Sequence, residues 1–346
     1  MAQRNHRVRD IADQAGLSAA TVDRVLHDRP GASARAVRAV ETALLDLDRQ
    51  ATQLRLARRT LLVDVVLDAP LRFRDVVREA TQGALVSLRP ATVRARFHES
   101  DNADPAEVAR TLDAVGASGR ASHGIVLKAP DDVRVAAAIR RASDRGIPTV
   151  TLVTDVGGSG RIAYVGLDNA AAGATAAYLL SHLLRGRPGA VLASVSHRAF
   201  LGEQERFAAF CEQLALRDPG REVLTLPDVR GDDDAMEQVT VAALTRHPEV
   251  VGVYSMGGGN AGLSRALESA GRGGTPFVAH DLDADNLPLL RAGVLTVVLH
   301  HDLRADLRGG LTQVLRAHRL VPGAPTSLPS PPQVVTPWNV PPRLRG

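Results

Sequence analysis

The sequence predicts an α/β protein with two parts: a small N-terminal helix-turn-helix module of three helices, and a larger two-lobed core of doubly wound parallel sheets. Two observations carry this prediction. Residues 8–26 have the apolar spacing of two short helices joined at Gly16. After residue 60, short apolar runs alternate with amphipathic segments of helical length, a pattern typical of parallel sheets covered by helices on both faces.

The N-terminal module, residues 1–47, is predicted to close around a small apolar core. Ile11 lies on the inner face of the first helix, and Gly16 can take the positive φ of a tight turn. Ser18 is a suitable N-cap for the second helix, and Ser33 for the third. In motifs with this outline, the second helix enters the major groove of DNA and its N-terminal side chains meet base edges.

Positive charge is concentrated near the N-terminus. Residues 1–60 contain eleven Arg and seven Asp or Glu, a balance of +4, and the whole chain has 42 basic and 38 acidic residues, which is also +4. The remaining 286 residues are therefore neutral overall. A basic module suits neutralisation of phosphates and predicts DNA binding that weakens with salt. Residues 48–60 are polar and basic, and we interpret them as a hinge or linker.

The rest of the chain, residues 61–346, is predicted to fold as two lobes. Buried strands are expected at residues 61–67, 124–127, 148–153, 190–195, 250–254, 276–279 and 295–299. About six strands per sheet is usual, so this pattern fits two sheets with a ligand crevice at the carboxyl ends of their strands. The lobes are placed approximately at residues 61–165 with 302–328, and at residues 166–301 with 329–346. The proline-rich tail from Pro322 is expected to wrap over the surface in extended form.

Composition excludes several classes of protein. A hydrophobic fraction of 45% is too high for a disordered chain, and the single cysteine, Cys211, cannot form an internal disulfide. The polar N-terminus excludes a conventional signal peptide, and no segment reaches the length of a membrane span. We therefore expect a cytoplasmic protein without a membrane partner. Lys128 is the only lysine beside 41 arginines, which we interpret as a bias of composition.

Several short blocks of residues occur together in this chain. They are Asp10-Ile11-Ala12, Ala15-Gly16-Leu17-Ser18, Thr21-Val22, Arg24-Val25-Leu26 and Ser33 near the N-terminus, and residues 164–169 with Gly173, Glu205-Arg206-Phe207 with Phe210, and residues 278–281 in the core. Through these blocks the chain resembles the lactose-repressor (LacI) family of bacterial transcription regulators over nearly its whole length. The resemblance implies a homodimer that binds a pseudo-palindromic operator in double-stranded DNA, and a core similar to periplasmic sugar-binding proteins.

The resemblance places the DNA contacts on the second helix and at the start of the third. The implied residues are Ser18, Ala19, Ala20, Thr21, Arg24 and Ser33. Ala19 and Ala20 can offer only apolar contact, which leaves Arg24 as the candidate for bidentate contact to guanine. Two alternatives stay open: Ser18 is only a cap, and Arg24 reaches only phosphate. Asp23 departs from the small hydroxyl residue usual in the family, so it must bind cytosine, pair with a cation or face away from DNA.

The hinge departs further from the family pattern. Family members usually have a Pro-Asn pair and then a Leu that wedges into the minor groove, whereas this chain has residues 51–58 in that place. Arg58 stands where the wedge is expected, so a leucine wedge requires a shift to Leu54 or Leu56. Arg58 could instead enter a narrow minor groove. The alternative is a flexible basic linker.

Between the lobes, the resemblance implies a small polyol such as a sugar, held by one apolar surface and several polar groups. Phe73 could stack on a ring face, Arg206 could donate two hydrogen bonds, and Asp281 could accept from vicinal hydroxyls. Asn260 follows three glycines before a helix, and His301 could take the place of a glutamine often found there. The structural alternatives are core packing for Phe73, a surface ion pair for Arg206 and a strand-end cap for Asp281.

No metal site or cofactor is expected. His280, Asp281, His300, His301 and Asp302 lie at two strand ends, but their spacing matches no regular metal-binding pattern. No catalytic Ser/His/Asp order or paired carboxylate motif stands out, so we do not expect an enzyme. The sequence favours a DNA-binding regulator, expected to be a repressor, that a small carbohydrate controls allosterically. A free-standing carbohydrate-binding protein and, behind it, a phosphosugar enzyme are the alternatives.

Overall fold

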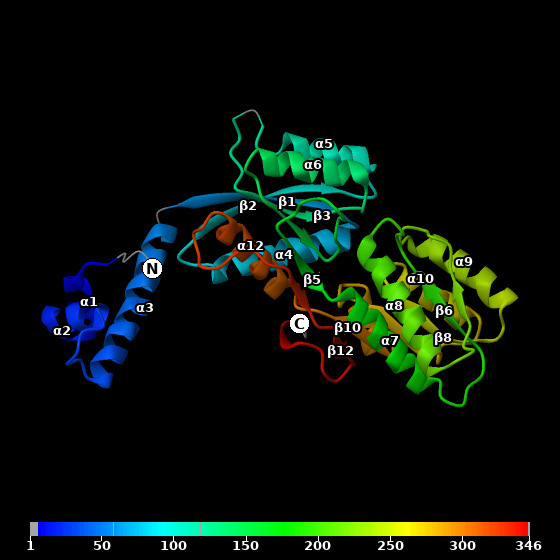
Figure 1. The fold of residues 1–346 in the computed structure, drawn as a ribbon. Coiled ribbons are helices and arrows are strands. Elements are labelled where there is room, and N and C mark those ends of the chain that lie inside the picture. Colours follow the sequence, from blue (N-terminus) through cyan, green and yellow to red (C-terminus); the bar gives the residue numbers. More distant parts are fainter. Residues whose placement is uncertain (1–5, 58, 118, 345–346) are drawn as a thin grey trace.

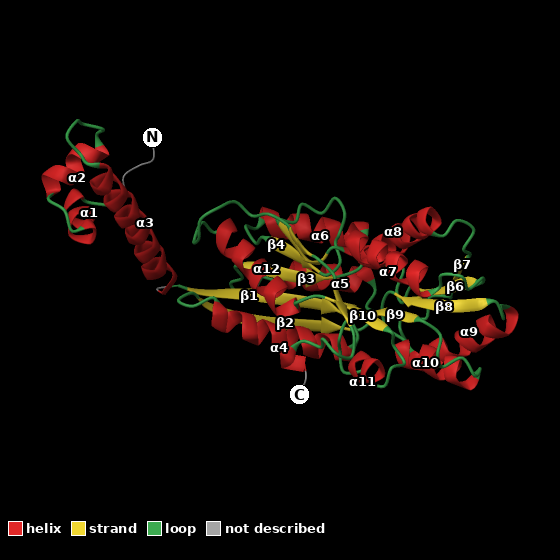
Figure 2. Ribbon diagram, turned by 90° about the horizontal axis from the view of Figure 1, so that it is seen from below, coloured by secondary structure: helices red, strands yellow, loops and turns green. Residues whose placement is uncertain are grey.

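The computed structural model describes residues 6–57, 59–117 and 119–344. Three helices at the N-terminus precede two α/β lobes (Figure 1). Each lobe contains one six-stranded sheet, and helices lie on both sides of the strands (Figure 2). The prediction of two doubly wound lobes is therefore confirmed.

The N-terminal unit is held together by a glycine turn, two hydroxyl caps and a small core. Its helices are α1 (Val8–Ala15), α2 (Ala19–Leu26) and α3 (Ala34–Ala57). Gly16 ends α1 with a φ of 63°, a left-handed conformation that glycine adopts without strain. The hydroxyl of Ser18 accepts a hydrogen bond from the backbone of Thr21, and that of Ser33 from the backbone of Ala36. The buried core residues are Ile11, Ala12, Val22, Val40 and Ala43.

Helix α3 is longer than predicted and takes the place of the expected linker. Instead of ending at Leu47, it continues to Ala57. Residues 48–57 contain neither Gly nor Pro and consist largely of good helix formers, so nothing in them ends the helix. Figure 1 shows α3 running from the N-terminal unit to the first lobe. The prediction of a linker at residues 48–60 is therefore wrong over most of its length.

The three hinge residues predicted to contact DNA differ in what the structure shows of them. Leu56 is 6% exposed and is buried in an apolar cluster at the base of the first lobe. Its buried partners are Leu61, Ala91, Leu315 and Leu320. Leu56 is therefore a core residue here, which corrects its prediction as a minor-groove wedge. Leu54 is 63% exposed, and Arg58 lies outside the described residues.

We expect Leu56→Ala to lower the free energy of unfolding by about 2–5 kcal/mol, because it removes buried methyl groups and leaves a cavity. Leu54→Ala is the matched control and should change stability by less than about 0.5 kcal/mol, since Leu54 is exposed. Urea denaturation followed by circular dichroism measures both variants. Equal losses in the two variants would contradict the assignment of Leu56 to the core.

The first lobe contains a parallel sheet with the strand order β11-β5-β4-β3-β1-β2. Its strands are β1 (Thr60–Asp68), β2 (Thr92–Ser100), β3 (Gly124–Lys128), β4 (Thr149–Leu152), β5 (Ala163–Leu167) and β11 (Leu328–Ser330). Its helices are α4 (Leu71–Ser87), α5 (Pro105–Ala114), α6 (Val133–Asp144) and α12 (Leu303–Ala317). Helices α4 and α12 pack into one apolar cluster with the sheet, and α5 and α6 pack into another on the opposite face.

The second lobe has the strand order β12-β10-β9-β8-β6-β7, and β12 alone runs antiparallel to its neighbour. Its strands are β6 (Ala190–Ser194), β7 (Val223–Thr225), β8 (Val250–Ser255), β9 (Phe277–His280), β10 (Val297–His300) and β12 (Gln333–Val335). Its helices are α7 (Asn169–Leu183), α8 (Leu201–Arg217), α9 (Asp233–Arg246), α10 (Asn260–Ser269) and α11 (Asn286–Arg291), and a short 3₁₀ helix, η1, spans Pro342–Leu344. Helices α7 and α8 bury one face of the sheet, while α9 and α10 bury the other.

The seven strands predicted from apolar runs are present, with ends shifted by one or two residues. The sequence analysis missed β2, β5 and β7, and in β2 the side chains of Arg94, Arg96 and His98 interrupt the apolar residues. These polar side chains are tolerated because β2 is an edge strand. The C-terminal tail is extended as expected, and it adds one edge strand to each sheet as β11 and β12.

The chain crosses between the lobes after β5, after β10 and between β11 and β12. Because of these three crossings, each lobe is built from segments that are far apart in the sequence. None of the described helices is both long enough and apolar enough to span a membrane.

Candidate functional site

A cavity of about 90 Å³ lies between the two lobes. Its lining includes the carboxyl ends of strands from both sheets: Asp68 ends β1 and Lys128 ends β3, while His280 ends β9. Phe73 on α4 and Arg206 on α8 also line it. This is the edge at which doubly wound sheets place their ligands.

Each lobe contributes carboxylates and cations to this cavity. The first lobe supplies Asp68 and Lys128 from neighbouring strands, whose register sets Leu67 opposite Lys128. The second lobe supplies Asp281, which directly follows β9, and Arg206. Glu203, Asp283, Arg72 and Arg230 also line the cavity, so four carboxylates that accept hydrogen bonds face four cations that donate them. The cavity therefore suits an uncharged ligand with several hydroxyl groups.

Two buried polar atoms at the cavity lack a partner among the described residues: Oδ2 of Asp68 and Nδ1 of His280. The other oxygen of Asp68 accepts hydrogen bonds from the Ser100 hydroxyl and the Ala103 backbone, each at 3.0 Å. The other ring nitrogen of His280 lies 2.9 Å from the Tyr254 hydroxyl. Buried polar groups are rarely left unpaired, so these two atoms point to a polar ligand.

Arg206 is held rigidly at the cavity wall. Its Nε donates to Oδ1 of Asn169 at 2.8 Å, and its Nη1 donates to the carbonyl of Met256 at 2.7 Å. Helices α7 and α8 pack so closely here that a Cβ on Gly173 would lie 2.1 Å from the Arg206 carbonyl oxygen. These contacts leave Nη2 for a ligand, since no described residue bonds to it.

Lys128 of the first lobe and Glu203 of the second lobe are buried charges that both line the cavity. Burial lowers the pKa of Lys128 to about 8, although the carboxylates of Glu203 and Asp68 act in the other direction. Burial raises the pKa of Glu203, and hydrogen bonds from Ser196 and His197 oppose that rise. The charges of Lys128 and Glu203 therefore stabilise each other within the closed cleft.

The lobes are joined across the cavity by an ion-pair bridge, defined as Arg72 with Asp283 and Asp285. Arg72 belongs to α4 of the first lobe, and its Nε lies 3.4 Å from Oδ2 of Asp283. Its Nη1 lies 3.1 Å from Oδ2 of Asp285. Both acidic residues belong to the loop that leads from β9 to α11 in the second lobe. The lobes are therefore closed over the cavity in this structure.

Comparison with known families decides the classification of the core. Residues 71–304 match the periplasmic binding protein domain family. The chain belongs to this family. A comparison with curated proteins finds no match.

Solved structures share the fold of this periplasmic binding protein domain. The glucose-galactose binding protein GanP from Geobacillus stearothermophilus is 18% identical, with a TM-score of 0.72, and the match covers 82% of this chain and 100% of that one. An ABC transporter solute binding protein from Burkholderia graminis, in complex with D-arabinose, is 22% identical, with a TM-score of 0.74 and coverage of 81% and 96%. A protein provisionally described as a LacI transcriptional regulator from Bacteroides fragilis is 14% identical, with a TM-score of 0.71 and coverage of 81% and 98%.

Three of the predicted ligand-binding residues line the cleft of the periplasmic binding protein domain: Phe73, Arg206 and Asp281. Sequence analysis did not identify Asp68, Lys128 or Glu203, which line it too. A signal for Lys128 was present, because the only lysine of the chain directly follows a predicted strand. Our interpretation of this lysine as a compositional bias overlooked its position.

The other two predicted ligand-binding residues lie behind the cavity wall of the periplasmic binding protein domain. Asn260 is 4% exposed and donates to Oδ1 of Asn286 at 2.9 Å; Asn286 in turn donates to the carbonyl of Asp281 at 2.8 Å. His301 is 2% exposed, bonds through Nδ1 to the Asp306 carboxylate, and has its Nε2 3.6 Å from Oδ1 of Asp281. Both residues therefore hold Asp281 in place, which corrects their prediction as direct ligand contacts.

The DNA-contact residues predicted on α2 and at the start of α3 lie in the N-terminal unit, away from the periplasmic binding protein domain. The exposed residues among them are Ser18, Ala19, Ala20, Arg24 and Ser33, while Thr21 is half-buried. Asp23 pairs with His27 at 2.9 Å and with Arg29 at 2.8 Å. Of the alternatives left open for the Asp23 carboxylate, the structure therefore contains pairing with a cation. In the part of the chain that is described, no three His, Cys, Asp or Glu side chains are grouped so that they could hold a metal ion.

Closure of the periplasmic binding protein domain should depend on pH through Asp283. Burial raises the pKa of this carboxyl to about 6, against the opposing effects of a backbone hydrogen bond and Arg72. If separation of the lobes hydrates Asp283, the closed form binds more protons between about pH 4 and 6. We therefore expect closure to become more favourable as the pH falls through 6.

Small-angle X-ray scattering of the ligand-free protein between pH 4.5 and 7.5 measures this effect as a fall in the radius of gyration on acidification. Asp283→Asn keeps the shape of the side chain and removes its titration, so the fall should be smaller in this variant. An identical pH profile in the variant would show that Asp283 is not the responsible group.

Proposed function

We propose that the cleft between the lobes binds a small carbohydrate or a related polyol. The observation that carries this proposal is the arrangement of carboxylates and cations from both lobes around a small cavity. Sugar hydroxyls can accept hydrogen bonds from Arg206 and can donate them to carboxylates such as Asp281. The unpartnered atoms of Asp68 and His280 add support, since a hydroxyl can bond with either. The sugars named for the similar structures, glucose, galactose and D-arabinose, point to the same class of ligand.

Isothermal titration calorimetry with D-glucose, D-galactose, D-arabinose and a set of polyols tests this proposal. We expect saturable binding of at least one compound to the wild type, weakened by Asp281→Asn. Failure of all neutral sugars and polyols to bind would contradict the proposal. Recovery of the bound compound unchanged after long incubation separates binding from the activity of a phosphosugar enzyme.

We further propose that the N-terminal unit is a helix-turn-helix that binds DNA, and that the chain is a LacI-type regulator, expected to act as a repressor. The left-handed turn at Gly16, the exposed N-terminal residues of α2 and the +4 balance of residues 1–60 support this. A homodimer in the cytoplasm would present two such units to a pseudo-palindromic operator. A carbohydrate can change operator affinity only if it binds the closed and open lobes with different affinity.

A free-standing carbohydrate-binding protein is the second candidate function. The glucose-galactose binding protein and the solute binding protein described above favour it, because both share the core fold over almost their whole length. Each of them matches about four fifths of this chain. The features that favour a regulator over a free-standing binding protein are the N-terminal unit and α3. We propose boundaries at residues 1–47 for the DNA-binding unit and 61–346 for the effector-binding core, with the second half of α3 between them.

Selection of random duplex DNA by the full-length protein at moderate salt distinguishes the two functions. Enrichment of a pseudo-palindromic sequence would support a dimeric regulator. Absence of any enriched sequence, with and without a bound carbohydrate, would contradict it and favour the free-standing binding protein. Analytical ultracentrifugation of the protein with the enriched duplex then gives the number of chains per operator.

A further inference from the structure

Lys128 has an unusual position for a buried cation, because it rests on aromatic rings. Its Nζ lies 3.4 Å from the centroid of the Phe200 ring and 5.4 Å from that of Phe73. The same nitrogen donates a hydrogen bond to the carbonyl of Asp68 at 3.2 Å. Lys128 is only 8% exposed, and the carboxylates near it act at longer range. The π faces and one carbonyl therefore supply the direct contacts that this ammonium needs once it leaves water.

The two rings belong to different lobes. Phe73 lies on α4 of the first lobe together with Lys128 on β3, whereas Phe200 is the N-cap residue of α8 in the second lobe. The short contact between Lys128 and Phe200 therefore joins the lobes. The His197 ring packs against Phe200 with the centroids 4.7 Å apart, which helps to hold the aromatic ring in place.

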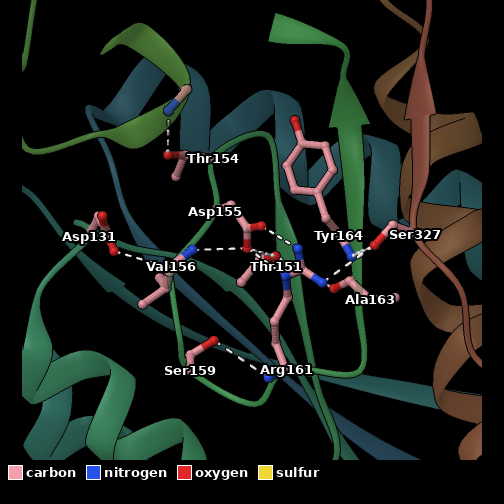
Figure 3. A network of polar contacts seen from close by, with 12 residues as sticks. Asp131, Thr151, Thr154, Asp155, Val156, Ser159, Arg161, Ala163, Tyr164 and Ser327 are labelled. Carbon is pink, nitrogen blue, oxygen red and sulfur yellow. Dashed lines mark hydrogen bonds and ion pairs between the residues drawn. The ribbon is translucent and has the colours of Figure 1, made fainter. Parts of the chain in front are cut away.

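Two more contacts join the first lobe to the same short segment of the second, residues 199–202. The backbone N–H of Asp131 donates to the carbonyl of Ala199 at 2.9 Å. The backbone N–H of Gly202 donates to the Thr154 hydroxyl at 3.1 Å, and Figure 3 shows this hydroxyl pointing from the loop after β4 toward the neighbouring lobe. The contact made by Lys128 lies in the middle of this series, and both it and the Thr154–Gly202 contact border the cavity.

We propose that Lys128 is an internal latch that competes with the ligand: its ammonium covers the aromatic surface of Phe73 and Phe200, holds the lobes together before a ligand enters, and is displaced from the rings when a ligand binds. This inference rests on the proposed carbohydrate function, because the C–H face of a sugar is suited to the same aromatic surface. A lysine stem is flexible, so the ammonium can leave the rings without a change of the backbone. The lowered pKa of Lys128 is consistent with an ammonium held away from water.

The first experiment uses the ligand-free protein and the fact that Lys128 is the only lysine of the chain. Labelling with ¹³C-lysine gives a single lysine side-chain spin system. We expect its ε-methylene protons to be shifted upfield by the ring current and to show nuclear Overhauser effects to a phenylalanine ring. Both signals should disappear in Phe200→Leu. An ε-methylene at the ordinary shift of a solvated lysine in the wild type would overturn the proposal.

The second experiment measures lobe opening in the same ligand-free protein. Small-angle scattering should give a larger radius of gyration for Lys128→Met and for Phe200→Leu than for the wild type. The double variant should show no further increase, because both substitutions remove the same contact between Lys128 and Phe200. Arg198→Met is the matched control, since it removes an exposed cation from the same loop. Additive increases in the double variant would show that the two residues act separately and would overturn the latch.

The third experiment separates a competitor from a direct ligand contact. We expect Lys128→Met to bind the sugar identified by calorimetry about 3- to 10-fold more tightly than the wild type, because the sugar no longer has to displace the ammonium. Weaker binding would show that Lys128 contacts the ligand directly and would overturn the competition. If no sugar binds either protein, the carbohydrate function fails, while the ligand-free experiments still decide whether the ammonium rests on the rings.

Discussion

Replacing Arg206 by Met is expected to abolish carbohydrate binding and to lower the free energy of unfolding by about 3–5 kcal/mol. The guanidinium is 3% exposed and donates to Asn169 and to the carbonyl of Met256. A hydrogen bond from a charged group contributes about 1.5–3 kcal/mol, and each partner left behind is a buried acceptor without a donor. Loss of this positive charge also leaves the buried carboxylate of Glu203 less well compensated.

Calorimetry and urea denaturation of Arg206→Met measure the two effects separately. Asp281→Asn is the control variant that should affect binding alone. The Asp281 side chain is 28% exposed, so loss of its negative charge should change stability little. It should weaken carbohydrate binding about 10- to 100-fold. Arg206→Lys keeps the positive charge but loses the planar guanidinium group with its several N–H donors. Compared with Arg206→Met, it should therefore regain part of the stability and little of the carbohydrate binding. Wild-type affinity in Arg206→Met would show that the ligand lies elsewhere.

The architecture of the core was predictable because most of its central strands are largely apolar, although the buried strand β5 was missed. Apolar runs are needed where a strand is buried on both faces, as in β3 and β4. Edge strand β2 escaped prediction because only part of it is buried, and Arg96 on it is instead paired with the buried carboxylate of Asp64. The continuation of α3 was missed because departure from the family pattern at the hinge was interpreted as a flexible linker, although residues 48–57 are good helix formers.

The candidate site was predictable only in part, for a topological reason. Phe73, Arg206 and Asp281 belong to recognisable positions at strand ends or on a helix, and all three line the cavity. Asp68 and Lys128 are single residues at the ends of two strands that are distant in the sequence. Only the pairing of β1 with β3 brings them together, and a sequence does not display that pairing.

Burial also decides which polar residues support the site and which contact the ligand. Asn260 and His301 have the side chains of ligand-binding residues, yet both are buried outside the cavity lining, where the amide nitrogen of Asn260 donates to Asn286 and Nδ1 of His301 bonds to Asp306. His301 directly follows β10, where the chain crosses from the second lobe to the first, and its partner Asp306 lies on α12 of the first lobe. Residues of both lobes therefore support Asp281. Its carboxylate, the proposed acceptor of ligand hydrogen bonds, keeps its position only while the lobes keep this arrangement.

Arg24→Ala is expected to lower affinity for the selected operator by about 1–3 kcal/mol for each half-site, and to relax the base preference at one position in each. Arg24 is exposed on α2, and Asp23 beside it is already paired with His27 and Arg29. The guanidinium of Arg24 can therefore reach a guanine without competition from that carboxylate. Fluorescence anisotropy with operator and single-base variants measures both the loss of affinity and the loss of preference.

The matched control is Arg49→Ala, because Arg49 is 76% exposed on α3 and far along that helix from α2. It should leave the base preference unchanged. If Arg24 contacts only phosphate, its loss will weaken binding to every sequence alike and reduce the salt dependence of the affinity, with no change in preference. If Arg24 contacts a base, affinity for unrelated DNA will fall much less than affinity for the operator. The comparison between specific and unrelated DNA therefore decides whether α2 reads sequence or only holds the backbone.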